Sequence, residues 1–275
     1  MTAGVSVRVE TVDGWPVANA ILTLTDLAGR QAGIATVDDD GETTLSGLVP
    51  GMYTAIFTAP GYHPSATATV VQDGRVTPLG TIRLERLASE HALPAPGPWT
   101  IDPAHSAIHV TARHAGIASV RGRLSKLGGR ITVGSPIERS SVTATIDASS
   151  VDTGNSMRDN HLRSADFLNV ERYPTITYQS TGLSPAGPDR WTVHGDLTMC
   201  GERHRVDLDM RYLGTDKDPF GFVRCGFRAS GQLRREEFRI SFAQTLATGV
   251  ALVGSTLRME IDIEAVQGET APDFG

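Results

Sequence analysis

Apolar and polar residues alternate along most of the chain in short runs with a period of two. Such alternation indicates β-strands that turn one face to water and the other to a core. Turn residues such as Asp13-Gly14 and Asp40-Gly41 separate the runs, at the short, regular spacing typical of all-β domains. Only residues near 155–168 depart from this rhythm, and they predict one short helix. The pattern therefore predicts an all-β protein.

The strand pattern is interrupted once, at residues 88–98, which contain three prolines and show no period. Proline fixes φ and removes a backbone donor, so this stretch is not expected to form a central strand. We interpret it as a stiff interdomain linker between a first domain at 1–87 and a second at 99–267. The polar residues 268–275 are expected to form a disordered tail.

The first domain carries about seven short strands with turn signals between them, which predicts a small β-sandwich. Four of its motifs are Gly14–Ala20, Val37–Gly41, Gly47–Tyr53 and Ala59–Tyr62. In order and spacing they resemble the carboxypeptidase-regulatory-like, prealbumin-type sandwich. That resemblance implies a structural or interaction module without catalytic activity.

The second domain carries longer alternating strands, about eight in number, with almost no helix to cover their apolar face. A sheet of this size is expected to close on itself as an antiparallel barrel. An eight-stranded barrel has an interior that can hold one ligand. The alternation places Val193, Leu197, Tyr212 and Leu257 on the inner face, and these four are candidate ligand contacts.

A series of motifs in this domain occurs in the order and spacing of one known family. They are Trp99–Ser106, His114, Val120–Gly122, Ser150–Gly154, Arg158–Leu162, Ala165–Leu168, Tyr173-Pro174 and Gly195–Thr198. The domain resembles the YceI-like family, lipocalin-like barrels that bind polyisoprenoids. The resemblance implies a lipid-binding barrel with one short helix at its mouth. Ile108–Val110 and Leu168 stand where the family often carries aromatic residues, which implies a less aromatic lining.

Polar candidates lie on and near the predicted helix. Ser156 and Asp159 have the spacing of a capping box. Arg158 and His161 share one helical face, where they either tie the helix to loops or donate to a ligand head group such as a phosphate or carbonyl. Phe167 could cover the barrel mouth. His114 ends a strand in phase with inner-face residues, as either a ligand contact or a satisfied core histidine. The expected ligand-binding residues are thus His114, Arg158, His161, Phe167, Val193, Leu197, Tyr212 and Leu257.

Composition and charge narrow the partners. The net charge is −6 and no basic stripe is present, which argues against nucleic acid. No apolar run reaches the length of a membrane helix and no secretory signal pattern opens the chain, so we expect a cytoplasmic protein. Cys200 and Cys225 lack partners at ligand spacing and are expected to be packed thiols. We therefore expect no metal site and no cofactor.

Three functions stay open at this point. Common catalytic motifs are absent, so we expect a binding protein and no enzyme. The first function is to carry or store a long apolar lipid, such as a polyisoprenoid or an isoprenoid quinone, and a tunnel with apolar lining would favour it. The second is an interaction or stress-response module, favoured by a barrel filled with side chains. The third is an isoprenoid-modifying enzyme, favoured by a buried nucleophile hydrogen-bonded to a base. The sequence is compatible with a homodimer.

Overall fold

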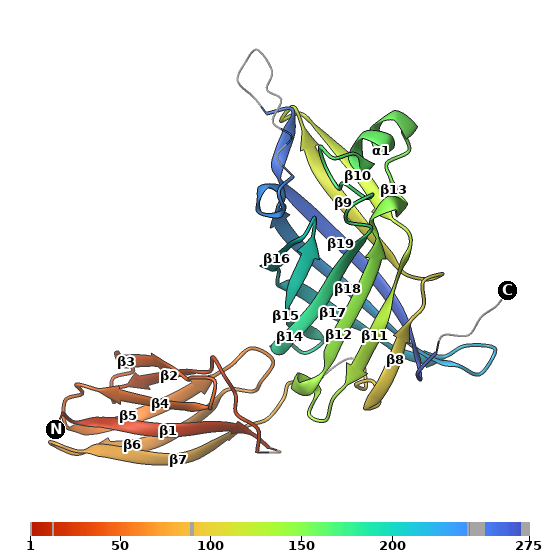
Figure 1. The fold of residues 1–275 in the computed structure, drawn as a ribbon. Coiled ribbons are helices and arrows are strands. Elements are labelled where there is room, and N and C mark those ends of the chain that lie inside the picture. Colours follow the sequence, from red (N-terminus) through yellow and green to blue (C-terminus); the bar gives the residue numbers. More distant parts are fainter. Residues whose placement is uncertain (1, 13, 89–90, 241, 243–250, 271–275) are drawn as a thin grey trace. The chain divides into compact units, whose positions relative to one another are not determined.

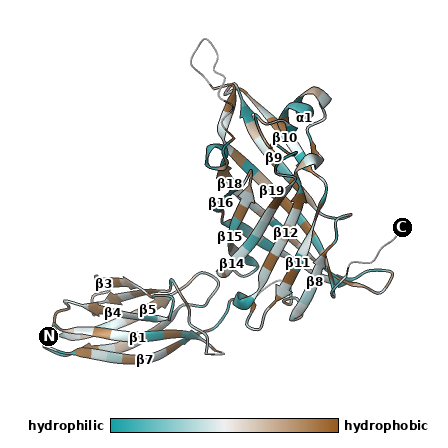
Figure 2. Ribbon diagram, in the orientation of Figure 1, coloured by the Kyte–Doolittle hydropathy of each residue, from teal (hydrophilic) through white to brown (hydrophobic). Residues whose placement is uncertain are grey.

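The computed structural model describes residues 2–12, 14–88, 91–240, 242 and 251–270. The chain divides into two compact units, and apart from residues 185–188 the boundary lies between residues 90 and 91. Each unit is built almost entirely of strands, as the alternation predicts (Figure 1). Hydrophobic and hydrophilic residues alternate in bands along these strands (Figure 2).

The first unit contains seven strands in two sheets, which confirms the predicted sandwich. One sheet has the order β4 (Glu42–Ser46), β1 (Gly4–Thr11), β7 (Val76–Leu84). The other has the order β3 (Gln31–Thr36), β2 (Ile21–Thr25), β5 (Gly51–Thr58), β6 (Ser65–Val71). Alternate residues of both sheets are buried in a single core, among them Val5, Val9, Leu22, Leu24 and Phe57. Burial of these inner faces stabilises the unit.

The second unit is one antiparallel sheet. Its strands are β8 (Gly97–Ile101), β9 (Ala107–His114), β10 (Ala118–Leu124), β11 (Leu127–Val133), β12 (Ser141–Asp147), β13 (Val151–Asp152), β14 (Thr175–Gly187), β15 (Arg190–Met199), β16 (Glu202–Arg205), β17 (Leu208–Lys217), β18 (Val223–Arg234) and β19 (Val253–Gln267). β16 pairs only with β15, beside the main path of the sheet.

The sheet closes because β19 pairs on both sides. One side pairs with β18, and the other pairs with β9 along its first part and with β8 along its last part. β8 and β9 therefore act as two halves of one interrupted strand. β10 and β11, and β12 and β13, are interrupted in the same way. Counted along the ring, the barrel has eight strands, as predicted, and the main path of the sheet closes on itself.

The helix α1 (Ser156–Arg163) lies at the end of the barrel where β9 and β10 meet (Figure 1). Its N-cap is Asn155, whose side chain accepts from the Arg158 N–H at 3.0 Å, so the predicted Ser156–Asp159 capping box is wrong. Asp159 is buried and accepts from the N–H and hydroxyl of Thr153 at 2.9 and 2.6 Å. Within the described residues, no helix is both long enough and apolar enough to cross a membrane.

The proline-rich segment at 88–98 is predicted to be a linker outside the barrel, but most of it belongs to the barrel unit. Residues 91–98 belong to the barrel unit, and β8 already begins at Gly97. Proline lacks the N–H that a ladder needs and is tolerated near the start of a strand, where Pro98 lies in β8. Its carbonyl accepts from the Gly268 N–H at 2.8 Å. Gly268 also accepts from the Thr100 hydroxyl. The start of the predicted disordered tail is thus bonded to β8, whereas residues 271–275 lie outside the described part.

A network of charges holds the turn that separates β8 from β9. Arg224 of β18 donates to Asp102 in this turn, to Glu264 of β19 and to Asp218, each at 2.6 Å. His105 lies 2.9 Å from Asp102. Burial alone would raise the pKa of Asp102, but hydrogen bonds from Arg224 and His105 hold that pKa below its ordinary value. One guanidinium therefore ties the interrupted strand to β18 and β19.

Removal of this guanidinium should destabilise the barrel in a pH-dependent way. Arg224→Met leaves the buried Asp102 and the half-buried Asp218 and Glu264 without this guanidinium, and we expect the free energy of unfolding to fall by about 2–3 kcal/mol at pH 7. Asp102 and Asp218 have lowered pKa values. Their stabilising effect is present above their unfolded pKa of about 4 and is lost as pH falls through the lower folded pKa. The loss should therefore shrink below about pH 4.

Denaturant unfolding at neutral and at acidic pH measures the loss in free energy of unfolding under each condition. Arg228→Met on the same strand is the matched control, because Arg228 is exposed and forms its ion pair among the described residues with the partly exposed Asp262. It should change the free energy of unfolding far less than Arg224→Met at either pH, because solvent screens an exposed ion pair. An equal loss for Arg224→Met at both pH values would assign its effect to packing and contradict the electrostatic account.

Candidate functional site

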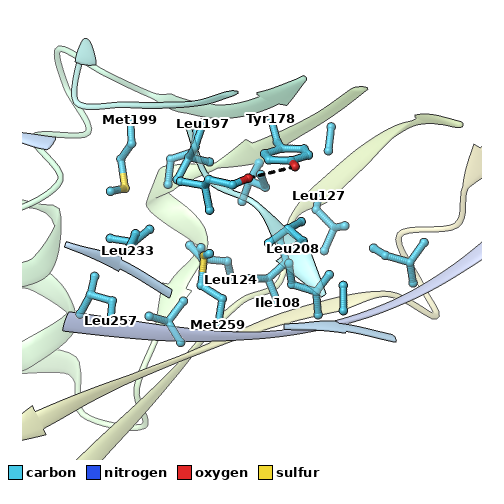
Figure 3. A pocket seen from close by; sticks show the side chains of 18 of the residues that line it. Ile108, Leu124, Leu127, Tyr178, Leu197, Met199, Leu208, Leu233, Leu257 and Met259 are labelled. Carbon is cyan, nitrogen blue, oxygen red and sulfur yellow. Dashed lines mark hydrogen bonds between the residues drawn. The ribbon is translucent and has the colours of Figure 1, made fainter. Parts of the chain in front are cut away.

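The barrel encloses a cavity of about 460 Å³. Side chains from opposite walls point toward one another across it (Figure 3). They are predominantly aliphatic, and include Ile108, Leu124, Leu127, Leu197, Met199, Leu208, Leu233, Leu257 and Met259. A cavity of this volume falls in the range of small-molecule sites. The barrel is therefore hollow and is not filled by its own side chains.

Tyr178 is one of the aromatic residues in this wall. Its hydroxyl donates to the carbonyls of Val193 and Val206 at 3.2 and 3.1 Å, so a buried polar atom is satisfied inside an apolar cavity. Burial, with Asp207 and Asp196 nearby, raises the pKa of this phenol well above its ordinary value, which keeps it neutral. The ring lies against Gly195 of β15. A Cβ at that position would lie 2.4 Å from the Tyr178 ring and hydroxyl.

The mouth of the cavity is formed around α1. His161 lies edge-on to Phe167 and Phe242, with ring centroids 5.0 and 5.2 Å away, and the two phenyl rings are 4.9 Å apart. The Nε2 atom of His161 lies 2.9 Å from the Asp166 carboxylate. Arg158 donates to the hydroxyl and carbonyl of Thr153 at 2.7 and 3.0 Å. Arg158 therefore ties the helix to the preceding loop and still borders the cavity.

Four arginines border the cavity, and two histidines lie beside them. We call these six residues the cationic mouth, after the arginines: Arg113, His114, Arg123, Arg158, His161 and Arg235. Among the described residues, no Asp or Glu borders the cavity, although the chain carries a net charge of −6. The four arginines also lack carboxylate partners within the described residues. Arginines elsewhere on the barrel, such as Arg190, Arg203 and Arg228, pair with aspartates.

Arg235 is the most deeply placed of these arginines. Its side chain is buried, and its guanidinium donates to the carbonyls of Gly254, Ile240 and Val253 at 3.0, 2.8 and 3.3 Å. Carbonyl dipoles satisfy its donors but do not neutralise its charge. A buried charge without a counter-ion is costly, so this end of the cavity favours an anionic group.

All eight residues predicted from the sequence border this one cavity. Val193 and Leu197 lie in the wall, Leu257 and His114 lie toward the mouth on neighbouring strands, and Tyr212 lies at the other end of the barrel. The sequence reasoning missed Tyr178, although its alternation with Ile176 would have placed it inward. It also missed Arg235 and Pro94, because their places depend on turns and on the proline-rich segment.

One hydrogen-bonded serine, histidine and carboxylate is found outside the cavity. The Ser184 hydroxyl lies 2.9 Å from Nε2 of His194, whose Nδ1 lies 2.9 Å from Asp207. Asp207 also accepts from Arg205 at 3.0 Å. None of these residues borders the cavity, and the carboxylate is well exposed. These contacts link neighbouring strands on the outer surface. The group is therefore not the buried nucleophile and base that would favour an enzyme.

The remaining candidates for chemistry are structural. Cys200 and Cys225 are both buried. Burial raises the pKa of the Cys200 thiol to about 11 and that of the Cys225 thiol to about 12, so neither offers a reactive thiolate at neutral pH. Asp102, His105 and Glu264 bring potential metal-ligand atoms within 4.8 Å of one another. Arg224 donates to both carboxylates, which makes this group part of the ion-pair network.

Comparison with known proteins agrees with this architecture. The YceI-like domain matches residues 99–265, and the carboxypeptidase regulatory-like domain matches residues 4–85. A UPF0312 protein of Vibrio cholerae is 31% identical over 60% of this chain and 83% of its own length. Protein YceI of Escherichia coli is 33% identical over 59% of this chain and 82% of its own. The crystal structure of Burkholderia cenocepacia BcnA shares the fold, with a TM-score of 0.52 and 19% identity over 60% of this chain and 98% of that one.

The contact between Gly195 and Tyr178 gives a test of the cavity wall. Gly195→Ala places a methyl group inside the Tyr178 ring contact, and we expect a loss of about 1–3 kcal/mol in the free energy of unfolding. Gly182→Ala in β14 is the matched control, because its Cβ would meet no atom closer than 3.9 Å. Truncation to Tyr178→Ala should relieve the two closest contacts and leave the Gln179 carbonyl at 2.9 Å, so the two losses should add only in part. Strict additivity in the double variant would contradict this account of the wall.

Proposed function

This chain belongs to the YceI-like family, and from that premise we propose that its barrel holds one long-chain lipid, as carrier or store. The observation that carries this proposal is the hollow barrel with its aliphatic lining. The ligand we propose is a polyisoprenoid or an isoprenoid quinone, with its apolar chain in the barrel and its polar end at the cationic mouth. The proposed role is binding, which is supported by the position of the hydrogen-bonded Ser184, His194 and Asp207 outside the cavity.

The lining supplies enough affinity for such a chain. Each isoprene unit has five carbons, and burial of one carbon contributes about 0.8 kcal/mol, so one unit contributes roughly 4 kcal/mol at most. A few units therefore approach the practical limit of roughly −20 kcal/mol for non-covalent binding. Additional contacts cannot raise affinity much beyond that point. The space inside the barrel, rather than the number of contacts, should then determine which chains are accepted.

The polar end of the ligand has a defined place in this proposal. An unpaired polar group inside the aliphatic part of the cavity would cost several kcal/mol, so it is expected where donors or water can reach it. The cationic mouth offers such donors and includes no acidic residue within the described part of the chain. Arginine donors match the oxygen atoms of a phosphate, so an anionic head group should bind more tightly than a neutral one.

Analysis of the lipid that copurifies with the full chain tests the function directly. The expected result is one class of long-chain lipid in amounts approaching one molecule per chain, identified by mass spectrometry after extraction. Delipidated protein should then take up the extracted lipid again, as measured by displacement of a fluorescent lipid probe. Failure to bind any long-chain lipid would overturn the proposal.

A matched pair of ligands tests the mouth. We expect a prenyl phosphate to bind more tightly than the prenyl alcohol of the same length, by a margin that decreases as salt increases. Arg158→Ala should weaken binding of the phosphate by about 1.5–3 kcal/mol and leave the alcohol nearly unchanged. Arg203→Ala is the control, because Arg203 pairs with Asp196 away from the cavity. Equal weakening of both ligands, with a lower melting temperature, would show that Arg158 acts only through its contacts with Thr153.

A further inference from the structure

The segment that precedes β8 crosses one end of the barrel. The Tyr212 hydroxyl donates to the carbonyl of Ala92 at 2.9 Å, and the Trp99 indole N–H donates to the carbonyl of Ala95 at 2.9 Å. Both aromatic side chains are almost completely buried, with exposed fractions of 1% and 0%. The carbonyls of this segment are therefore the acceptors for two buried donors, which fixes its position against the barrel.

Two residues between these anchors reach the cavity, although Leu93 is also 42% exposed to solvent. Leu93 and Pro94 both border the cavity, and Pro94 is buried. Proline has a fixed φ and little conformational freedom, so Pro94 forms a stiff wall. The ring of His91 packs edge-on against Tyr212, with centroids 6.0 Å apart, and holds the start of the segment.

This wall lies at the end of the barrel opposite the mouth. Along β19, Val253 pairs with His114 of the cationic mouth, whereas Gln267 pairs with Trp99 beside the segment. These two positions are fourteen residues apart on one strand, which corresponds to roughly 45 Å of strand length. A chain that enters with its polar end at the mouth therefore extends toward Leu93 and Pro94.

We propose that Leu93 and Pro94 form the floor of the cavity and set the longest chain that this barrel accepts. The inference rests on the proposed function, because it concerns the length of the bound chain. The match to the YceI-like domain begins at residue 99. The floor is thus supplied by a part of this chain that lies before the matched domain, and that connects it in sequence to the first unit.

The experiment compares chain-length profiles in the full-length protein. The probes are prenyl alcohols that differ by single isoprene units, each titrated by displacement of a fluorescent lipid. Pro94→Gly removes the ring from the floor and should improve binding of the first alcohol beyond the wild-type limit by about tenfold, since added carbons become buried. Leu93→Trp enlarges a floor residue and should move the limit to shorter chains.

Pro96→Gly is the matched control. Pro96 is exposed, lies in the same segment and does not border the cavity, so it reproduces the backbone effect of a proline-to-glycine change without opening the floor. Its length profile should match the wild type within about twofold, a margin well below the tenfold shift expected at Pro94.

The outcomes separate the two proposals. An unchanged length limit in both floor variants, with short alcohols still bound, would overturn the floor and leave lipid binding intact. Failure of the wild-type protein to bind alcohols of any length would instead overturn the proposed function. A shift for Pro96→Gly as large as that for Pro94→Gly would also contradict the floor, because it would assign the effect to a looser segment.

Discussion

The pairing of β19 on both of its edges is the contact on which the rest of the second unit depends. A sheet with one apolar face must cover that face. The described part of the unit offers one short α-helix for this, so the sheet covers its face by closing. β19 completes the ring by pairing with β18 on one side and with β9 and β8 on the other. The interruption between β8 and β9 would weaken this closure, and Arg224 bonds that turn to the neighbouring strands.

Closure also decides what the interior can contain. Inward residues of eight strands are too few and too small to fill the ring, so an aliphatic cavity remains. Tyr178 satisfies its hydroxyl on two backbone carbonyls, which leaves the surrounding wall apolar. Charge then distinguishes the two ends. Arginines without carboxylate partners in the described part of the chain surround the helical end, whereas Leu93 and Pro94 meet the cavity at the other end. An interior of this kind suits a ligand with one apolar and one polar end.

The proline-rich segment has a different role in the folded protein from the one that its sequence predicts. Its prolines exclude it from a regular strand interior, and this makes it look like a spacer. In the folded protein its free carbonyls meet the buried donors of Trp99 and Tyr212, and its apolar side chains meet the end of the cavity. Residues outside the recognisable barrel domain therefore contribute to the barrel interior.

The sequence by itself determined the strands, the two units and the inward phase of Val193, Leu197 and Leu257, because period-two alternation is a local property that backbone geometry enforces. It also indicated the helix and the basic residues near it. Only the tertiary structure decided which residues meet across the barrel. The buried Arg235, the contact between Gly195 and Tyr178, and the N-cap at Asn155 in place of Ser156 all depend on contacts between segments that alternation does not relate. The position of Pro94 at the end of the cavity is of the same kind, because it requires hydrogen bonds from a residue more than a hundred positions away in the chain.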